Sequence, residues 1–323
     1  MQNILIFKTD RLGDLLNISP VIFNLKQNYP NSKITLVCSN YNKSIANYYS
    51  NDLNILVYNK PFIFFLIKHL KNFIFTKYDL IMQLDGKNHS YLFSIFIRSK
   101  IKVCLKFIKK KLILGINFSI TRPNTFFNFF FDYSVDSVEN YNLSNNSDYH
   151  YLSLYLKLLN KLDINIVNKN HYLPFKNISK VSKFDESYFF IHIDNRWDLF
   201  DPSVIDSLKN KISSLALNNK IVLCSNIGGN YVFNKLKIKL NNISNIQIVH
   251  GPSIHDTISL IHSSHTCVSS HSGLVVHAGA AFKKKIIDLV PLNIFNELDR
   301  WIPFNITYKR YDINDFKDKI FEI

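Results

Sequence analysis

The feature that most restricts the fold of this chain is an alternation of short apolar runs with segments of helical periodicity, and it occurs twice. In the first half, apolar runs lie at 4–7, 34–38, 54–57 and 80–84. In the second half, they lie at 188–193, 221–224, 246–250, 266–269 and 285–289. Strands that alternate with helices form parallel sheets covered on both faces. The pattern therefore predicts an α/β protein with two doubly wound, Rossmann-like domains.

The length of the chain agrees with two such domains. Its 323 residues exceed what one hydrophobic core usually supports, so two domains of roughly 150 residues each are expected. The segment 165–185 is polar and lacks a sustained period, which is typical of a linker. We therefore expect a first domain at 1–170 and a second at 171–323. A helix is expected at 150–162, whereas 117–147 has no clear period and is predicted to be irregular.

The composition indicates a globular protein that favours anionic partners. Apolar residues make up 47% of the chain, which argues against disorder. The 39 Lys and Arg residues against 24 Asp and Glu give a formal charge of +15, which favours phosphate esters, nucleic acid or an anionic membrane surface. Charge alone does not choose among these. Because the sequence contains no nucleic-acid-binding motif, we expect no nucleic-acid partner.

Three observations favour a cytoplasmic protein, soluble or peripheral at the inner face of a membrane. The first apolar run lacks a preceding basic segment and is broken at Lys8 and Asp10, unlike a signal peptide. The longer apolar stretches, including 62–67 and 126–131, are shorter than the roughly 18 residues that a membrane span needs. The cysteines form no Cys-x-x-Cys pair and are expected to be reduced core thiols; they are Cys38, Cys104, Cys224 and Cys267.

The loop after the first apolar run places a glycine and a carboxylate at the start of an expected helix. It reads Asp10-Arg11-Leu12-Gly13-Asp14, and Pro20 follows. Open parallel sheets bind ligands at the carboxyl ends of their strands, so this loop is a candidate site. The loops at 194–199, 225–230, 250–254 and 270–273 are candidates for the same reason. By itself, Asp14 is also consistent with a carboxylate that only stabilises a helix terminus.

The last of these loops lies between a strand and a helix of small residues. Ser272 and Gly273 begin that helix, and His277-Ala278-Gly279-Ala280-Ala281 continues it. Exposed N–H groups at such a helix start bind a diphosphate without a metal ion. The alternative is that the small residues serve only close packing of the helix on the sheet.

Taken together, the two loops resemble those of glycosyltransferase family 9, the lipopolysaccharide heptosyltransferases. That family has an Asp-Arg-Ile-Gly-Asp-like turn leading to a Pro, matched here by 10–14 and Pro20. It also has an Asp-Ser/Thr-Gly segment followed by His and alanines, matched by 271–273 and 277–281. Looser matches are Arg196-Trp197 and the segment 251–254. The resemblance extends over both expected domains.

The resemblance implies a GT-B architecture, two Rossmann-like domains with a cleft between them, and a metal-independent inverting sugar transfer. The donor would be a nucleoside diphosphate sugar, ADP-heptose in the characterised members, and the acceptor a lipopolysaccharide-type or other surface glycan. Asp14 would be the general base. The residues implied to contact the donor are Arg11, Gly13, Asn195, Arg196, Ser253, His271, Ser272, Gly273 and His277. The resemblance implies no cofactor beyond the donor substrate and no metal.

Two positions depart from the family pattern. Asn195 stands where the family has a Lys that meets the diphosphate, which leaves Arg196 or Arg11 as the cation. His271 stands where the second motif begins with Asp, and this removes an acid beside the bound anion. These departures leave a second hypothesis open, a nucleotide-sugar-binding relative with weak or no turnover.

Two further segments are candidates for contact with an anionic membrane surface or an acceptor. The segment 61–75 combines aromatic residues with Lys68 and Lys71, and it fits either a surface helix or a buried one. The segment 98–111 contains seven Lys or Arg residues and fits a solvated strand face or an anion-binding surface. The histidines of the second half lack a Cys or carboxylate at ligand spacing, so no zinc site is predicted.

Overall fold

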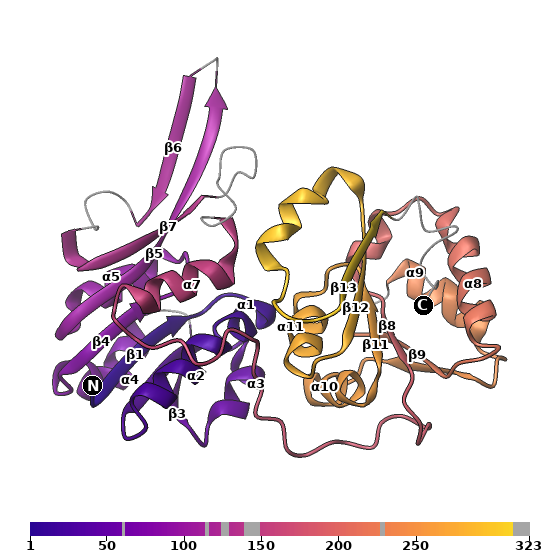
Figure 1. The fold of residues 1–323 in the computed structure, drawn as a ribbon, viewed down its shortest axis with the longest axis horizontal. Helices are drawn as coiled ribbons and strands as arrows, with labels where there is room; N and C mark the ends of the chain where they lie inside the picture. The colour runs from indigo at the N-terminus through magenta and orange to yellow at the C-terminus, as the bar shows by residue number, and fades with distance from the viewer. Residues whose placement is uncertain (60–61, 114–115, 124–128, 139–148, 227–229, 313–323) are drawn as a thin grey trace. The chain divides into compact units, whose positions relative to one another are not determined.

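The computed structural model describes residues 1–59, 62–113, 116–123, 129–138, 149–226 and 230–312, which form two compact units. The first unit contains Met1–Pro174 and Asp299–Trp301, and the second contains Phe175–Leu298 and the chain from Ile302 onward. Each unit is built around one sheet flanked by helices (Figure 1). The predicted α/β class with two parallel-sheet domains is confirmed.

The sheet of the first unit has the strand order β3-β2-β1-β4-β5-β6, and β7 also pairs with β5. Its strands are β1 (Asn3–Lys8), β2 (Lys33–Ser39), β3 (Leu53–Tyr58), β4 (Tyr78–Gln83), β5 (Ser99–Ile113), β6 (Ile116–Arg122) and β7 (Tyr133–Val138). All pairings are parallel except that of β5 with β6. Because β1 pairs with both β2 and β4, the strand order reverses there. Ligands of open α/β sheets bind at such a switch point.

Strand β1 is buried on both faces, as a central strand of a covered parallel sheet must be. Ile4, Leu5, Ile6 and Phe7 have 0% exposed surface. A continuous apolar run, not an alternating one, is the pattern of such a strand. Burial of one side chain of this size stabilises by about 1.5–3 kcal/mol relative to leaving it exposed. The run therefore fixes β1 in the centre of the sheet and places the following loop at its carboxyl edge.

The helices of the first unit are α1 (Leu12–Asn17), α2 (Ser19–Asn28), α3 (Lys43–Ala46), α4 (Phe62–Ile74), α5 (Asn88–Phe96) and α7 (Tyr151–Asn160). The apolar positions from Leu15 to Leu25 predict one continuous helix, but the structure breaks it at Ile18. Pro20 accounts for the break because its nitrogen has no hydrogen to donate to the preceding turn. The break leaves α1 as a short, separate helix that carries Asp14.

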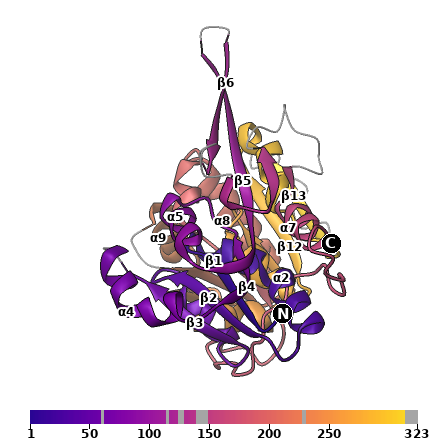
Figure 2. The same ribbon diagram turned by 90° about the vertical axis from the view of Figure 1, so that its left-hand side faces the viewer.

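The segment 117–147, predicted to be irregular, contains two strands, and the prediction is wrong there. Strand β6 forms an antiparallel hairpin with β5 that extends beyond the rest of the sheet (Figure 2), and β7 pairs with β5 in parallel. In β6, Ile116, Phe118 and Ile120 alternate with polar residues, which is the period of a strand. The parts of this segment at 124–128 and 139–147 lie outside the described residues.

The basic segment 98–111 lies in strand β5. Val103, Leu105 and Phe107 are buried, whereas Lys109 is exposed. Because side chains alternate between the two faces of a strand, Lys109 lies on the same face as these three residues, and β5 changes from buried to exposed along its length, toward its hairpin with β6.

The first unit continues to Pro174, beyond the expected boundary at 170, and residues of α1 and α2 hold the segment that follows α7. His171 Nε2 lies 2.9 Å from Asn17 Oδ1, and the backbone N–H of Tyr172 donates to the Ser19 hydroxyl at 3.0 Å. Asn24 holds the preceding part: its Oδ1 accepts hydrogen bonds from the backbone N–H groups of Val167 and Asn168, at 2.7 and 3.0 Å. Its Nδ2 donates to the carbonyl of Asn168 at 2.6 Å. The polar segment expected to be a linker has no helix or strand, but its first part belongs to the first unit.

The sheet of the second unit has the order β10-β9-β8-β11-β12-β13, with every pairing parallel. Its strands are β8 (Phe189–His192), β9 (Ile221–Ser225), β10 (Ile246–His250), β11 (Thr266–Ser269), β12 (Lys285–Val290) and β13 (Tyr308–Asp312), and its helices are α8 (Val204–Leu215), α9 (Tyr231–Leu240), α10 (Ile254–Ser263) and α11 (Gly273–Ala281). The strand order reverses at β8, between β9 and β11. The charged edge strand β13 was not predicted, because it lacks an apolar run.

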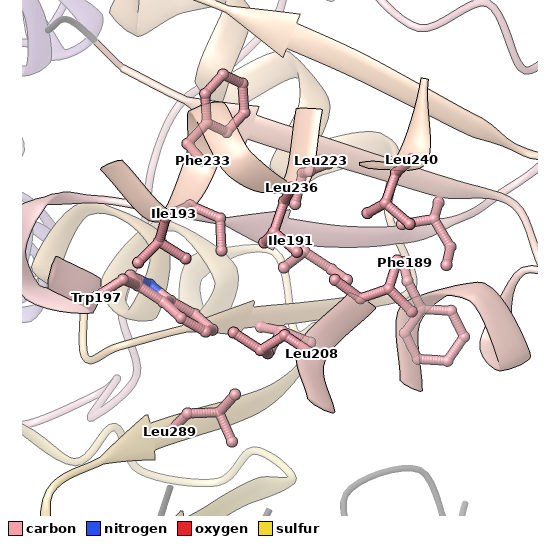
Figure 3. Close-up of a cluster of buried hydrophobic side chains, with 14 of the residues drawn as sticks. Phe189, Ile191, Ile193, Trp197, Leu208, Leu223, Phe233, Leu236, Leu240 and Leu289 are labelled. Carbon is pink, nitrogen blue, oxygen red and sulfur yellow. The ribbon is translucent and has the colours of Figure 1, made fainter. Parts of the chain in front are cut away.

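Trp197 anchors the loop after β8 in the core of the second unit. It lies in the 3₁₀ turn η4 (Asn195–Leu199) and has 0% exposed surface. In Figure 3 its indole lies among Ile193, Leu208 and Leu289, within a larger apolar cluster. The buried indole therefore fixes the position of the polar residues that precede it in this turn.

Candidate functional site

In the first unit, Asp14 lies in the first turn of α1, directly after the loop that follows β1. Its Oδ2 accepts a hydrogen bond from the backbone N–H of Arg11 at 3.3 Å. Asp14 is half-buried and Arg11 is exposed, whereas Gly13 is buried. The carboxylate is thus held at the carboxyl edge of the sheet with part of its surface open to solvent. Arg11, Gly13 and Asp14 thus lie in one turn at this edge of the sheet.

Beneath this loop, the structure adds a buried ion pair to which sequence reasoning gave no role. Lys8 Nζ lies 3.0 Å from Asp10 Oδ2, donates to the carbonyl of Leu84 at 3.0 Å and contacts the hydroxyl of Tyr155 at 3.1 Å. Burial is the largest single effect and opposes the charge on Lys8, but Asp10, Tyr155 and Asp14 together outweigh burial and raise the pKa of Lys8. Burial also raises the pKa of Asp10, to about 7, against the opposing effect of Lys8.

Asp85, which follows β4, ties the loops on the two sides of the switch point together. Its Oδ2 accepts hydrogen bonds from the backbone N–H of Thr9 at 2.8 Å and from the Thr9 hydroxyl at 2.6 Å. It also accepts from the Ser90 hydroxyl at 3.0 Å. Asp85 is fully buried. Sequence reasoning missed it, although an acid directly after an apolar strand, at 85, was the available signal.

In the second unit, the turn between β11 and α11 carries His271, Ser272 and Gly273. His271 adopts a φ of 50°, in the left-handed region. Ser272 precedes the first residue of α11, and its backbone N–H donates to the Ser269 hydroxyl at 3.2 Å. The first N–H groups of a helix have no partner within the helix, so this turn presents donors suited to an anion.

The fully buried Asp288 of β12 organises this turn. It accepts hydrogen bonds from the Ser269 hydroxyl at 2.8 Å, from the Tyr308 hydroxyl at 2.8 Å and from the backbone N–H of His271 at 3.2 Å. Its Oδ2 lies 2.6 Å from His271 Nδ1. Burial acts to raise the pKa of Asp288, but His271 and the hydrogen bonds hold it below its ordinary value.

Asp288 bears on one departure from the family pattern. The replacement of the family's Asp by His271 was expected to remove an acid beside the bound anion. In the structure, the carboxylate of Asp288 on the next strand contacts the imidazole of His271. An acid within the apolar run of β12 was the signal that could have pointed to it.

The loop after β8 meets the same turn. The guanidinium of Arg196 donates to the carbonyl of His271, and it pairs with both carboxylate oxygens of Asp194, with Nε to Oδ2 at 3.0 Å. Asp194 itself was not predicted. A pocket of about 250 Å³ opens here, and it is lined by Asp194, Asn195, Arg196, Ser225 and Asn226. Residues 227–229 of the adjoining loop lie outside the described residues.

Two other residues predicted to contact the donor, Ser253 and His277, lie at helices α10 and α11 of the second unit. Ser253 caps α10: its hydroxyl accepts from the backbone N–H of Asp256 at 3.0 Å and donates to the carboxylate of Asp256 at 2.7 Å. His277 is buried on α11, with 1% of its surface exposed. Among the predicted residues, Arg196 is joined to the 271–273 turn by its hydrogen bond to the carbonyl of His271.

Within the described ranges, no group of three His, Cys, Asp or Glu side chains could hold a metal ion. The four cysteines are buried and unpaired by disulfides. No helix in the described part of the chain is long and apolar enough to cross a membrane.

Comparison with known proteins identifies the architecture. Neither a protein-family model nor a curated protein matches the sequence. Among solved structures, the E. coli heptosyltransferase WaaC with ADP matches with a TM-score of 0.71 and 14% identity, over 98% of both chains. A glycosyl transferase family 9 structure from Veillonella parvula matches with a TM-score of 0.71 and 15% identity, over 96% of this chain and 87% of that one.

A third match is the E. coli ADP-heptose lps heptosyltransferase II, with a TM-score of 0.66 and 14% identity, over 96% of this chain and 90% of that one. The chain has the GT-B fold. At this level of identity the likeness establishes the fold alone. In this GT-B chain, the polar groups described above follow β1, β4, β8 and β11, the strands that adjoin the two switch points, where open α/β sheets bind ligands.

Proposed function

We propose that this GT-B protein is a metal-independent inverting glycosyltransferase that acts at the cytoplasmic face of a membrane. It transfers a sugar, heptose in the first instance, from a nucleoside diphosphate sugar such as ADP-heptose to a lipopolysaccharide-type or other surface glycan. One observation carries the proposal: the two segments that resemble the transferase motifs, 10–14 and 271–273, each follow a strand at a switch point. The likeness to a heptosyltransferase with ADP supports the nucleotide.

The second unit supplies the groups suited to a diphosphate. Helix α11 begins at Gly273, whose backbone N–H has no partner within the helix, and Arg196 is joined to the preceding turn through the carbonyl of His271. Donors fixed in advance stabilise negative charge as it develops on a leaving group, and they need no bound metal to do so. The pairing of Arg196 with Asp194 offsets part of its charge while fixing its orientation.

The first unit supplies the candidate base. The Asp14 carboxylate accepts the proton of the acceptor hydroxyl as that oxygen attacks the anomeric carbon. The bond between the anomeric carbon and the diphosphate oxygen breaks, and its electron pair leaves with the diphosphate. Attack opposite to the leaving group inverts the anomeric centre.

The test is a panel of ADP-, UDP-, GDP- and CDP-sugars. We expect one nucleotide to raise the melting temperature most, because a ligand at a hundred times its dissociation constant stabilises by about 2.7 kcal/mol. With a lipopolysaccharide-core acceptor, that donor is expected to release its nucleoside diphosphate. Stabilisation without release would favour the alternative, a catalytically weak or inactive binding relative, for which Asn195 and His271 are the motivating departures. No stabilisation by any member of the panel would refute the proposal.

Helix α4 supports a proposal of contact with an anionic membrane surface. Phe65 and Phe73 are buried in the first unit, whereas Phe64 (66%), Ile67 (64%) and Phe75 (80%) are largely exposed. The sequence left a buried and a surface helix open, and α4 has both faces. Exposed aromatic residues on a chain of charge +15 suit the interface of an anionic bilayer.

Vesicle flotation tests this contact. We expect binding to vesicles that contain phosphatidylglycerol and little binding to phosphatidylcholine alone. The Phe64→Ser, Phe75→Ser double variant is expected to lower the bound fraction at least about tenfold, because it removes two apolar side chains from the contact. Leu217→Ser, on the second unit and 77% exposed, is the matched control and should bind like the wild type. Equal binding of the two variants would refute this surface.

A further inference from the structure

The first unit contains a polar pocket that the proposed transfer does not use. It has a volume of about 600 Å³ and lies between β5, β7 and the end of α7, which packs against β7 (Figure 1). Its polar lining residues are Lys106, Ser134, Asp136, Lys157, Asn160 and Lys161. Ligand pockets usually have volumes of about 300–1,000 Å³. This one therefore has room for a substituted sugar, and not only for a small ion.

The lining of the pocket carries an excess of positive charge. Three lysine ammonium groups line it against one carboxylate, that of Asp136. Lys106 Nζ lies 3.9 Å from Asp136 Oδ1, which is longer than a direct hydrogen bond. Lys161 Nζ donates to the carbonyl of Ser134 at 2.8 Å, a bond that takes one of its three hydrogens. Such an excess of positive charge in one pocket favours an anionic ligand.

The kind of cation points to the kind of anion. The cations that line the pocket are all lysines. A lysine binds a phosphate as a compact point charge with three rotatable donors, whereas the planar fork of an arginine matches the two oxygens of a carboxylate. Lys106 belongs to the basic segment 98–111, for which the sequence left a solvated strand face or an anion-binding surface open. The lining favours a phosphate group.

The pocket lies at the same edge of the sheet as the loop that carries Asp14. In the register of the sheet, Ser134 pairs with Cys104, which in turn pairs with Gln83. Gln83 pairs with Phe7, the residue before the last of β1. Neighbouring strands lie about 4.7–4.9 Å apart, so β7 lies about 14 Å from β1 across β4 and β5. A phosphate held there would stand away from the sugar ring that presents its hydroxyl to Asp14.

We propose that this pocket binds a phosphate group of the acceptor glycan, at a place separate from the hydroxyl that reacts at Asp14. This inference rests on the proposed sugar transfer and adds a requirement for its acceptor. The lysines of the pocket contact no reacting atom. They determine which glycans bind, by favouring those that carry a phosphate at the right distance from the reacting hydroxyl.

Isothermal titration calorimetry without donor tests the pocket. The probes are a phosphorylated lipopolysaccharide-core oligosaccharide and the same oligosaccharide after phosphatase treatment. We expect the wild type to bind the phosphorylated probe at least about tenfold more tightly, because hydrogen bonds to charged groups are the stronger ones. Equal binding of the two probes, or binding of neither, would overturn the inference.

Variants assign the preference to the pocket. The Lys106→Met, Lys161→Met double variant removes two ammonium groups and should abolish the preference. Asn160→Asp adds a carboxylate at an exposed position of the lining, so it should weaken the preference even if the double variant proves unstable. The matched control is Lys33→Met, Lys77→Met, two exposed lysines at the amino ends of β2 and β4, which should keep the preference. A preference that survives in both pocket variants would contradict the assignment.

The transfer assay gives a second readout. In the double variant of the pocket, KM for the phosphorylated acceptor is expected to rise about tenfold. The loss should lie in KM and not in kcat, because contacts away from the reacting atoms bind the ground state and the transition state alike.

Flotation with vesicles that contain phosphatidic acid tests a lipid headgroup as the other source of a phosphate. Loss of vesicle binding in the pocket variants, with no preference between the two oligosaccharides, would assign the pocket to a lipid and overturn the inference.

The outcomes separate this inference from the proposed function. Stabilisation by a donor sugar together with equal binding of the two oligosaccharides overturns the inference and leaves the proposed function standing. A preference that the pocket variants abolish, with neither donor stabilisation nor transfer, refutes the proposed function and keeps the pocket as a site for phosphorylated glycans.

Discussion

Asp14→Asn is expected to lower the rate of sugar transfer by about 10²- to 10⁴-fold, the usual contribution of a general base. Asn keeps the oxygen that accepts the hydrogen bond from the backbone of Arg11, so α1 should still form. What it loses is the capacity to take a proton from the acceptor hydroxyl. The measurement is release of nucleoside diphosphate at saturating donor and acceptor.

The control for this variant is Asp52→Asn, an exposed acid of the same unit. It should transfer sugar at the wild-type rate, and both variants should bind the donor as tightly as the wild type. Asp10, whose pKa of about 7 also suits a base near neutral pH, is the competing residue. Full activity in Asp14→Asn together with loss in Asp10→Asn would transfer the role to Asp10.

Trp197→Ala is expected to lower the free energy of unfolding of the second unit by about 3–5 kcal/mol. The side chain has 0% exposed surface, and its removal leaves a cavity beneath the turn that carries Arg196. Trp197→Phe should lower the free energy of unfolding by less than the lost side-chain volume implies. The indole Nε1 is buried without a hydrogen-bond partner, so Phe also removes an unpaired donor.

Urea unfolding followed by circular dichroism measures both variants, with Leu217→Ala as an exposed control expected within about 0.5 kcal/mol of the wild type. Because the turn after β8 depends on the indole, Trp197→Ala should also weaken stabilisation by the donor sugar. A change below about 1 kcal/mol would show that the core repacks and that the indole does not anchor the turn.

Much of the fold could be predicted because the central strands are buried on both faces. The runs at 4–7 and 266–269 are too short for helices, and short loops connect them to segments of helical period. The strands that were missed, β6, β7 and β13, lie toward the side or edge of a sheet. There partial exposure allows polar and charged residues, and the apolar signal weakens.

The residues of the candidate site that directly follow a strand could be predicted from the sequence. The contacts that depend on the order of strands and helices in space could not. Asp14 and Ser272 follow strands directly, so their places could be read from the sequence. The contact of His271 with Asp288 joins residues 17 apart, and that of Lys8 with Tyr155 joins residues 147 apart. Both depend on which elements the fold brings together, and one sequence carries no record of that.

The backbone at position 271 restricts how this protein can vary. At a φ of 50°, Gly, Asn, Asp and His are tolerated far better than other residues. The Asp of the resembling family and the His of this chain both belong to that small set. A lineage can therefore exchange one for the other, replacing a carboxylate with an imidazole while the path of the main chain stays the same.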